Sequence, residues 1–315
     1  MSTVPRLNTR TRTGGLIKRA RKCWQLYLIF LVPLIYILVF KYGPMYGVQI
    51  AFKNYTAVKG IWGSPWVGFK YFRRFFESYE FSRVLWNTLS LSVYQLIVGF
   101  PIPIILAISL NYTENKGFKS VVQMVTYAPH FISTVVMVGM LLQFLSLRTG
   151  LVNRVIGLFG GADINFMGEP GYFKSIYVWS GVWQGMGYSS IIYLSALSGI
   201  DPCLHEAAIV DGASKVKRIW HIDLPGILPT IVVLFIMRMG DVLSVGFEKA
   251  FLMQNPLNER TSEIVSTYVY KIGLAASIPN YSYATAIGLF ISLINFVLIV
   301  TVNKIARKIS GSALW

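Results

Sequence analysis

The sequence contains little charge and few side chains suited to metal binding or catalysis. Only 13% of its 315 residues are charged, about half the share found in a soluble domain, so most of a water-solvated surface is missing. Its two cysteines and three histidines are scattered, without the spacing of a metal site or of an H-E-x-x-H motif. No G-x-x-x-x-G-K-[ST] loop occurs, which excludes a P-loop ATPase. We therefore expect no catalytic residue and no metal site in this chain.

Acidic residues are scarcer than basic ones, 13 against 29, which gives a net charge of +16. A basic excess of this size is found in nucleic-acid-binding proteins, but here the basic residues gather at the ends of apolar runs. That arrangement is typical of the cytoplasmic flank of a membrane helix, so we expect no nucleic-acid partner. The N-terminal cluster consists of Arg6, Arg10, Arg12, Lys18, Arg19, Arg21 and Lys22.

Long apolar stretches, in contrast, are abundant. Hydrophobic residues make up 54% of the chain, aromatic residues 15%, and the mean hydropathy is +0.55. A membrane-spanning helix needs about 20 mostly apolar residues. We expect an all-α protein in a lipid membrane with six transmembrane helices, near residues 24–40, 85–110, 121–146, 175–198, 229–251 and 284–303.

The basic cluster also predicts the orientation of these helices, because Lys and Arg are enriched on the cytoplasmic side. Residues 1–23 are then a basic cytoplasmic segment, and residues 24–303 form the membrane domain. The tail, residues 304–315, is cytoplasmic as well. The first apolar run is followed by "KYGPMYGVQ", which lacks a small-residue cleavage site and predicts an uncleaved anchor.

A polar stretch, "EAAIVDGASKVKRIWHIDLP", separates the fourth and fifth apolar runs. Asp201 followed by Pro202 is a good helix start, and Gly212 can end that helix in a left-handed conformation. Ser214 can cap a second short helix, which we expect Pro225 to end. The periodicity predicts a compact helix–turn–helix on the cytoplasmic side, and by itself it suits an ordinary amphipathic loop equally well.

The spacing within this loop resembles the EAA signature of ABC importer permeases. Glu206, Ala207 and Ala208 are followed four residues later by Gly212, and after nine more residues by Ile222-Asp223-Leu224-Pro225. A second stretch, "VGFKYFRRFFESYEFSRVLWNT", looks like the segment before the second span of carbohydrate-type permeases. Within that family the chain resembles the LplB/YteP-like group, and it is similar to a permease subunit of the bacterial alginate importer.

This resemblance implies the type I ABC importer permease fold and a role in ATP-driven import of an oligosaccharide across the bacterial cytoplasmic (inner) membrane. The chain would form half of the translocation pathway, with residues 199–228 as its coupling loop. The implied partners are a second permease subunit, two copies of a cytoplasmic ABC ATPase and an extracytoplasmic sugar-binding protein. No cofactor belongs to this chain, because ATP and Mg bind the ATPase. The implied coupling residues are Glu206, Ala207, Ala208, Asp211, Gly212, Ile222, Leu224 and Pro225.

Charged residues inside a span are costly, so they are candidates for function. In the fifth span Asp241, Ser244 and Glu248 would fall on one helical face, and Arg238 could pair with Asp241. A purely structural ion pair is the alternative. The fourth span carries "VWSGVWQGMGY", where aromatic rings and polar groups suit a sugar, although such residues also form interfacial belts. The predicted substrate-pathway residues are Trp183, Gln184, Gly185, Tyr188, Asp241, Ser244 and Glu248.

Two other functions compete with this interpretation. One is a membrane enzyme, but no candidate catalytic residues in the sequence have the spacing that such an enzyme would need. An ion-coupled transporter is compatible with the intramembrane charges, but it would not need an EAA helix, and its uptake would persist without an ATPase. The nature of the sugar stays open at this point, and the positive charge makes an acidic oligosaccharide conceivable.

Overall fold

The computed structural model describes residues 22–310 and residue 314. In these residues the chain is helical, and a single antiparallel bridge between Lys53 and Trp66 is the only extended pairing. The all-α prediction is therefore confirmed for the described part of the chain. Of the N-terminal basic cluster, only Lys22 lies within the described residues.

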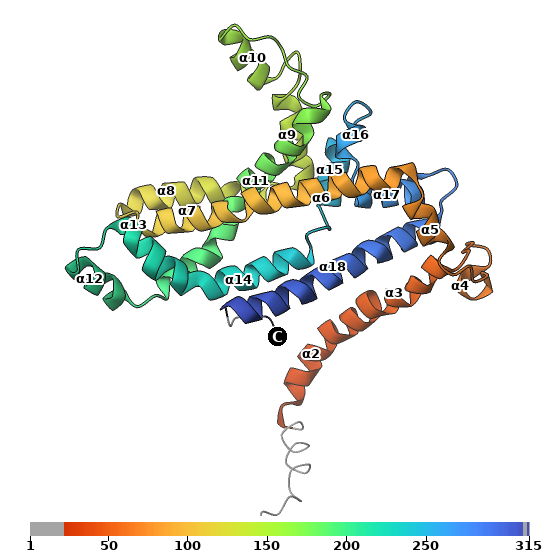
Figure 1. Ribbon diagram of the computed structural model, residues 1–315, viewed down its shortest axis with the longest axis horizontal. Coiled ribbons are helices and arrows are strands. Elements are labelled where there is room, and N and C mark those ends of the chain that lie inside the picture. Colours follow the sequence, from red (N-terminus) through yellow and green to blue (C-terminus); the bar gives the residue numbers. More distant parts are fainter. Residues whose placement is uncertain (1–21, 311–313, 315) are drawn as a thin grey trace, which may run out of the picture.

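Most of the chain is a series of helices joined by short turns (Figure 1). Short 3-10 or π-helical turns extend several of them, namely η2 (Leu38–Tyr42), η3 (Tyr46–Phe52), η4 (Ala128–Phe131), η5 (Ile219–Asp223) and η6 (Lys271–Ala275). In chain order the α-helices are α2 (Trp24–Ile37), α3 (Gly43–Met45), α4 (Gly60–Gly63), α5 (Lys70–Phe76), α6 (Tyr79–Gly99), α7 (Pro101–Asn111), α8 (Lys116–Tyr127), α9 (Thr134–Phe144), α10 (Leu151–Leu158), α11 (Pro170–Ser198), α12 (Pro202–Val210), α13 (Lys215–Arg218), α14 (Leu224–Gly240), α15 (Phe247–Met253), α16 (Glu259–Ser262), α17 (Val265–Tyr270) and α18 (Tyr281–Ser310).

Four of the helical stretches that the structure describes are long and apolar enough to cross a membrane: Trp24–Phe52, Tyr79–Asn111, Lys215–Gly240 and Tyr281–Lys308. A fifth candidate is the helix pair that begins at Lys116, which is bent by 103°. The third apolar run is therefore not the single helix expected over residues 121–146. Pro129 lies in η4 at the bend and has no N–H for a helical hydrogen bond, and Ser133 caps the second arm by accepting from the Val136 N–H.

The fourth expected span corresponds to α11, which is 29 residues long but is not among these apolar stretches. Small and polar residues such as Gly181, Gln184 and Ser190 interrupt its apolar sequence. Helices α6, α7, α8 and α14 all contact α11. Because α11 packs against protein on several sides, it has less need of an apolar surface. The structure thus supports four or five spans, and a sixth crossing by α11 remains a prediction.

Two glycines lie where α11 and α14 pack closely against their neighbours. A Cβ atom added to Gly187 would lie 2.1 Å from the carbonyl oxygen of Thr126 on α8. One added to Gly240 would lie 2.8 Å from the side chain of Ile299 on α18. Only glycine permits the backbone contact at Gly187, as expected where helices pack closely in a membrane protein, whereas the Ile299 side chain could shift to admit a larger residue at 240.

The fifth span differs from its predicted bounds at both ends. The helix ends at Gly240 rather than near residue 251, and a non-helical segment separates it from α15. Gly240 is a weak helix former and is held against α18, which explains the early end. At the other end, Pro225 does not end the second short helix as expected. The π-turn η5 links α13 to α14, and Pro225 occupies the first turn of α14, where its missing N–H costs little.

In Figure 1 helix α12, from the predicted coupling loop, lies at one end of the bundle, while α4 and α5 lie at the other. Helix α2 diverges from the rest of the molecule and has no buried residue. The C-terminal helix α18 continues to Ser310, so much of the expected tail at 304–315 is a continuation of the last span.

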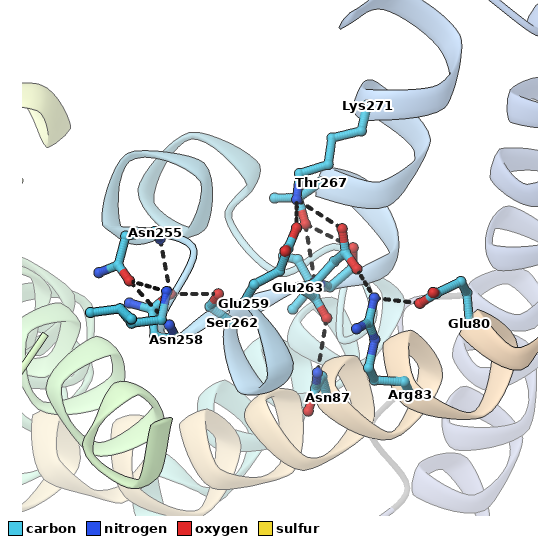
Figure 2. A network of polar contacts seen from close by, with 12 residues as sticks. Glu80, Arg83, Asn87, Asn255, Asn258, Glu259, Ser262, Glu263, Thr267 and Lys271 are labelled. Atoms are coloured by element: carbon cyan, nitrogen blue, oxygen red, sulfur yellow. Dashed lines mark hydrogen bonds and ion pairs between the residues drawn. The ribbon is translucent and has the colours of Figure 1, made fainter. Parts of the chain in front are cut away.

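Near the α5 end, an ionic network joins α6 to the segment that contains α16 and α17 (Figure 2). The Glu263 side chain is 4% exposed and accepts from Arg83 and, at 2.9 Å, from Lys271. Arg83 also pairs with Glu80, and Lys271 also pairs with Glu259. Two cations thus compensate one buried carboxylate, as the cost of burying charge requires.

We expect the substitution Arg83→Met to lower the free energy of unfolding by about 1–3 kcal/mol. This is less than for a fully buried pair, because Arg83 is partly exposed. Lys215→Met is the matched control: its partner Glu114 is 87% exposed, so the loss should stay below about 1 kcal/mol. Thermal unfolding in detergent measures the stability of both variants. Equal losses would contradict the claim that the ionic network around Glu263 stabilises the fold more than an exposed ion pair does.

Candidate functional site

The loop between α11 and α14 has the turn structure that its sequence predicts. Asp201 accepts from the Cys203 N–H at 2.9 Å, and Ser214 caps α13 by accepting from the Lys217 N–H. Gly212 has φ +74°, and the N–H of Ala213 donates to the Ala208 carbonyl at 2.8 Å. This is a Schellman ending, whose left-handed position favours glycine. The caps at Asp201 and Ser214 and the turn at Gly212 are confirmed.

Helix α12 contributes no side chain to the core of the chain. It has no buried residue, and Glu206, Ala207, Asp211 and Gly212 are all exposed, with Ala208 half-buried. Apolar side chains are exposed beside them, above all Val210 at 88%. An exposed helix with small and apolar residues at the tip of the bundle (Figure 1) offers a surface for a partner protein.

The start of α14, in contrast, is attached to the bundle. Leu224 packs against a core cluster formed by residues of α7, α11 and α14. A Cβ atom added to Gly226 would lie 2.7 Å from the Ile200 side chain, so the two ends of the loop touch. Ile222 is half-buried and Pro225 is exposed.

Asp223 is the polar anchor of this loop, and the sequence did not reveal its partners. It is fully buried. The Tyr112 hydroxyl, at the end of α7, donates to Asp223 Oδ2 at 2.7 Å. On α12, His205 Nε2 lies 3.4 Å from Asp223 Oδ1. Burial, and after it the hydrogen bond to Asp223, raises the pKa of Tyr112 to about 12, so the hydroxyl stays protonated and donates at neutral pH. One carboxylate therefore connects α7, α12 and the start of α14.

A cavity of about 410 Å³ lies between α6, α7, α11, α14 and α15, a size typical of small-ligand sites. Four of the predicted substrate-pathway residues line it: Gln184, Gly185, Asp241 and Ser244. Two cationic side chains that were not predicted to contact substrate, Arg238 and Lys249, also line it, together with the polar residues Ser92, Gln95, Thr134 and Ser189.

The four predicted substrate-pathway residues that line the cavity differ in their surroundings. Gln184 donates to the Ile132 carbonyl at 2.8 Å, across the bend before α9. A Cβ atom at Gly185 would meet no atom within 4 Å, so the helix backbone is open to the cavity there. Ser244 accepts from Asn295 on α18 at 3.1 Å, and Asp241 is exposed.

The other three predicted residues lie apart from this lining. Tyr188 borders an adjoining cavity of about 350 Å³, which Asp241 and Arg238 also line. Its ring stacks on the imidazole of His130 with centroids 3.9 Å apart. Trp183 is 43% exposed and Glu248 is exposed on α15, and neither belongs to the lining of these two cavities.

Two geometric expectations for the fifth span were wrong. Asp241, Ser244 and Glu248 do not share a helical face, because α14 ends before Asp241 and Glu248 belongs to α15. Arg238 and Asp241 form no ion pair in the described part of the chain. Their one direct hydrogen bond joins the Asp241 N–H to the Arg238 carbonyl at 3.3 Å.

Lys249 is a candidate that the sequence argument overlooked. It is 9% exposed, its Nζ donates to the Tyr177 carbonyl at 2.7 Å, and it lies 4.5 Å from the centre of the Tyr177 ring. Its position was assigned to the end of a span, where lysine commonly reaches for water. The sequence does contain a signal for Lys249, since this lysine stands directly before the apolar run that starts at Ala250.

No group of three or more His, Cys, Asp and Glu residues is placed to hold a metal ion within residues 22–310 and 314. The polar side chains of the cavity are amides, hydroxyls and single charges. Such groups can bind a hydroxylated ligand by hydrogen bonds.

Comparison with known proteins identifies the kind of transporter to which this bundle belongs. Residues 99–311 match the family of binding-protein-dependent transport system inner membrane components. Protein LplB of Bacillus subtilis (strain 168) is 42% identical over 290 residues, covering 92% of this chain and 91% of the relative. The polygalacturonan/rhamnogalacturonan transport system permease protein YteP of the same strain is also 42% identical, covering 92% and 90%.

A solved structure agrees with these relatives. A chain from the crystal structure of a bacterial alginate ABC transporter, in complex with an alginate pentasaccharide-bound periplasmic protein, superposes with a TM-score of 0.87. It is 39% identical and covers 94% of this chain and 99% of that chain. The chain therefore belongs to the family of binding-protein-dependent transport system inner membrane components. It is a membrane permease of the ABC type for carbohydrate import.

The buried contact of Asp223 can be tested by stability. Asp223→Ala should lower the free energy of unfolding by about 1–3 kcal/mol, because the half-buried Tyr112 hydroxyl loses its acceptor. Asp223→Asn keeps an acceptor oxygen and should cost less. Asp211→Ala, at an exposed aspartate of the same loop, should stay within about 0.5 kcal/mol. Similar losses for Asp223→Ala and Asp211→Ala in thermal unfolding would show that the contact does not stabilise the loop.

Proposed function

We propose that this chain is the transmembrane permease subunit of an ATP-driven importer for an oligosaccharide in the bacterial cytoplasmic membrane. It pairs with a second permease subunit, so that each contributes half of the translocation pathway. Two copies of a cytoplasmic ABC ATPase supply the energy, and an extracytoplasmic sugar-binding protein delivers the substrate. The observation that carries the proposal is the exposed α12 surface joined to the bundle through Asp223, in a chain related to sugar permeases.

The coupling part of the proposal rests on the contrast between the two ends of the loop. Helix α12 presents Glu206, Ala207 and Ala208 for contact with a partner, and small side chains allow close approach. Gly212 provides the left-handed turn that ends α12. Leu224 and Asp223 attach the other end to α7 and α11. A movement of the ATPase can then be passed to the spans as a rigid-body shift.

The substrate part rests on the cavity beside α11. Gln184 and Ser244 offer hydrogen-bonding groups, Asp241 offers a carboxylate, and Gly185 leaves open backbone for a sugar ring. Tyr188 extends the same surface into the adjoining cavity. Trp183 and Glu248 lie outside both linings, and a contact from them requires movement of the helices during alternating access.

An ion-coupled transporter is the main competing function. It would use the intramembrane charges to bind an ion and would continue to import its substrate without ATP. A loop with the spacing of the EAA signature has no role in such a transporter, so the ATP dependence of uptake in proteoliposomes separates the two functions. Uptake that persists after the ATPase is removed would contradict the proposal.

Substitutions on α12 should separate coupling from folding. Glu206→Lys reverses the charge offered to the ATPase, and Gly212→Val strains the left-handed turn by about 1–2 kcal/mol. We expect either change to lower sugar uptake at least about tenfold, while the protein still inserts in the membrane. Glu77→Lys, on an exposed residue after α5, is the control and should leave uptake unchanged. Normal uptake in both α12 variants would refute the coupling role.

Substitutions in the cavities should affect transport and spare assembly. Removing one hydrogen bond to a charged group costs about 1.5–3 kcal/mol, so Asp241→Ala should lower uptake and substrate-stimulated ATP hydrolysis about tenfold. Tyr188→Ala, which removes an aromatic face, should also lower uptake and substrate-stimulated ATP hydrolysis. Asp163→Ala, in the exposed segment before α11, is the control. If both rates are unchanged while the ATPase stays associated, these two residues do not line the pathway.

A further inference from the structure

The segment between the first two membrane spans, residues 53–78, carries basic side chains that no acidic group compensates. It contains five Lys and Arg residues but one acidic residue, Glu77, and none of the five forms an ion pair in the part of the chain that the structure describes. The neighbouring network in Figure 2 differs, because there Arg83 and Lys271 both contact Glu263. Helices α4 and α5 of this segment lie at the end of the bundle opposite α12 (Figure 1). The enrichment of Lys and Arg on the cytoplasmic side, where α12 is predicted to lie, therefore does not account for them.

Helix α5 directs three of these cations to one side. Its Tyr71 and Phe75 are buried in a core cluster that includes residues of α18. Lys70, Arg73 and Arg74 are exposed and stand three or four residues apart, which places them on one helical face. The packing of α5 against α18 therefore turns this face, the basic face of α5, toward the surroundings of the protein.

The contacts of the segment place it at the level where the spans end. Three candidate membrane spans end at or beside it, namely Trp24–Phe52, Tyr79–Asn111 and Tyr281–Lys308. Ser282, at the start of the third, donates to the Lys53 carbonyl at 2.6 Å. The Arg74 guanidinium lies 4.8 Å from the centre of the Tyr283 ring. Since an apolar span ends where hydrocarbon gives way to lipid headgroups, the basic face of α5 lies at the level of the headgroups.

The same region also exposes large aromatic side chains. Trp62 and Phe69 are 83% and 72% exposed, and Tyr79, the first residue of α6, is 86% exposed. Trp and Tyr are enriched at the membrane–water interface, where their rings sit among the headgroups. An acidic protein surface would also match the positive charge, but the position at the end of three spans favours lipid.

We propose that the basic face of α5 binds the phosphate groups of anionic phospholipids in the leaflet opposite α12. Arg73 and Arg74 each present a guanidinium group, whose forked donors match phosphate oxygens, and Lys70 adds a third charge. Clusters of Lys and Arg beside a membrane span attract anionic headgroups. This lipid site does not depend on the proposed function, because it concerns the bilayer around the chain and not the transported sugar.

The experiment uses the assembled transporter in phosphatidylcholine vesicles that contain a small fraction of a photoactivatable lipid. One probe is a phosphatidylglycerol and the other a phosphatidylcholine, each with the same reactive group close to the headgroup. After illumination, proteolysis and mass spectrometry measure the labelling of residues 53–78. We expect about tenfold more labelling by the anionic probe at low salt, because several cations attract it, and a smaller difference as salt screens the charges.

The triple variant Lys70→Gln, Arg73→Gln and Arg74→Gln should reduce labelling by the anionic probe to about the level of the neutral probe. Lys70→Arg combined with Arg73→Lys and Arg74→Lys keeps the charge and should keep most of the preference, which separates the loss of charge from an effect on folding. Arg148→Gln with Arg154→Gln is the control for position. Both are exposed cations outside the segment, and their loss should leave its labelling unchanged.

Two outcomes would overturn the inference: equal labelling of the segment by both probes in the unmodified transporter, or a triple Gln variant that keeps the full preference. If that variant keeps the preference and binds the sugar-binding protein about tenfold more weakly, the basic face of α5 docks that protein rather than lipid. ATP-dependent uptake by proteoliposomes tests the proposed function separately, and its absence would leave the lipid site intact.

Discussion

The structure depends on the requirement that polar groups in a membrane bundle be held by protein rather than by lipid. Helix α11 meets this requirement by packing against helices α6, α7, α8, α14 and α16. Its Gly187 lets the α8 backbone approach closely, while Gln184 reaches the carbonyl at the α9 bend. Because α11 is enclosed in this way, one of its faces can be polar and border a cavity. The cavity and the transport role proposed for it follow from that position.

At the end of the bundle near α12, the same requirement produces a mechanical connection. A buried carboxylate is costly by itself, and Asp223 becomes tolerable because Tyr112 and His205 surround it. Those two groups come from other elements, so the contacts of one buried carboxylate also link the exposed helix α12 to the spans. The proposed coupling surface and its attachment are therefore parts of one arrangement, and the apolar packing of Leu224 is its second support.

Local features of this arrangement could be predicted from the sequence. The caps at Asp201 and Ser214 and the left-handed turn at Gly212 depend on neighbouring residues only, and all three were confirmed. The helix end at Gly240 was missed because the apolar sequence continues past it, and Gly240 packs beside Ile299, a residue far away in the chain. Because α14 ends there, the prediction that Asp241, Ser244 and Glu248 share one helical face was also wrong. The partners of Asp223 and Lys249 were missed for the same reason, since each pairing joins distant segments.

The central claim is that α12 contacts an ATPase, and the chain carries a natural probe for it. Cys203 is exposed on α12, and the other cysteine, Cys23, is exposed at the start of α2. A thiol-reactive cross-linker applied to the assembled transporter should join this chain to the cytoplasmic ATPase. Cys203→Ser should abolish that product, and Cys23→Ser should leave it. A product that persists without Cys203, or none from a complex that hydrolyses ATP and imports sugar, would contradict the account.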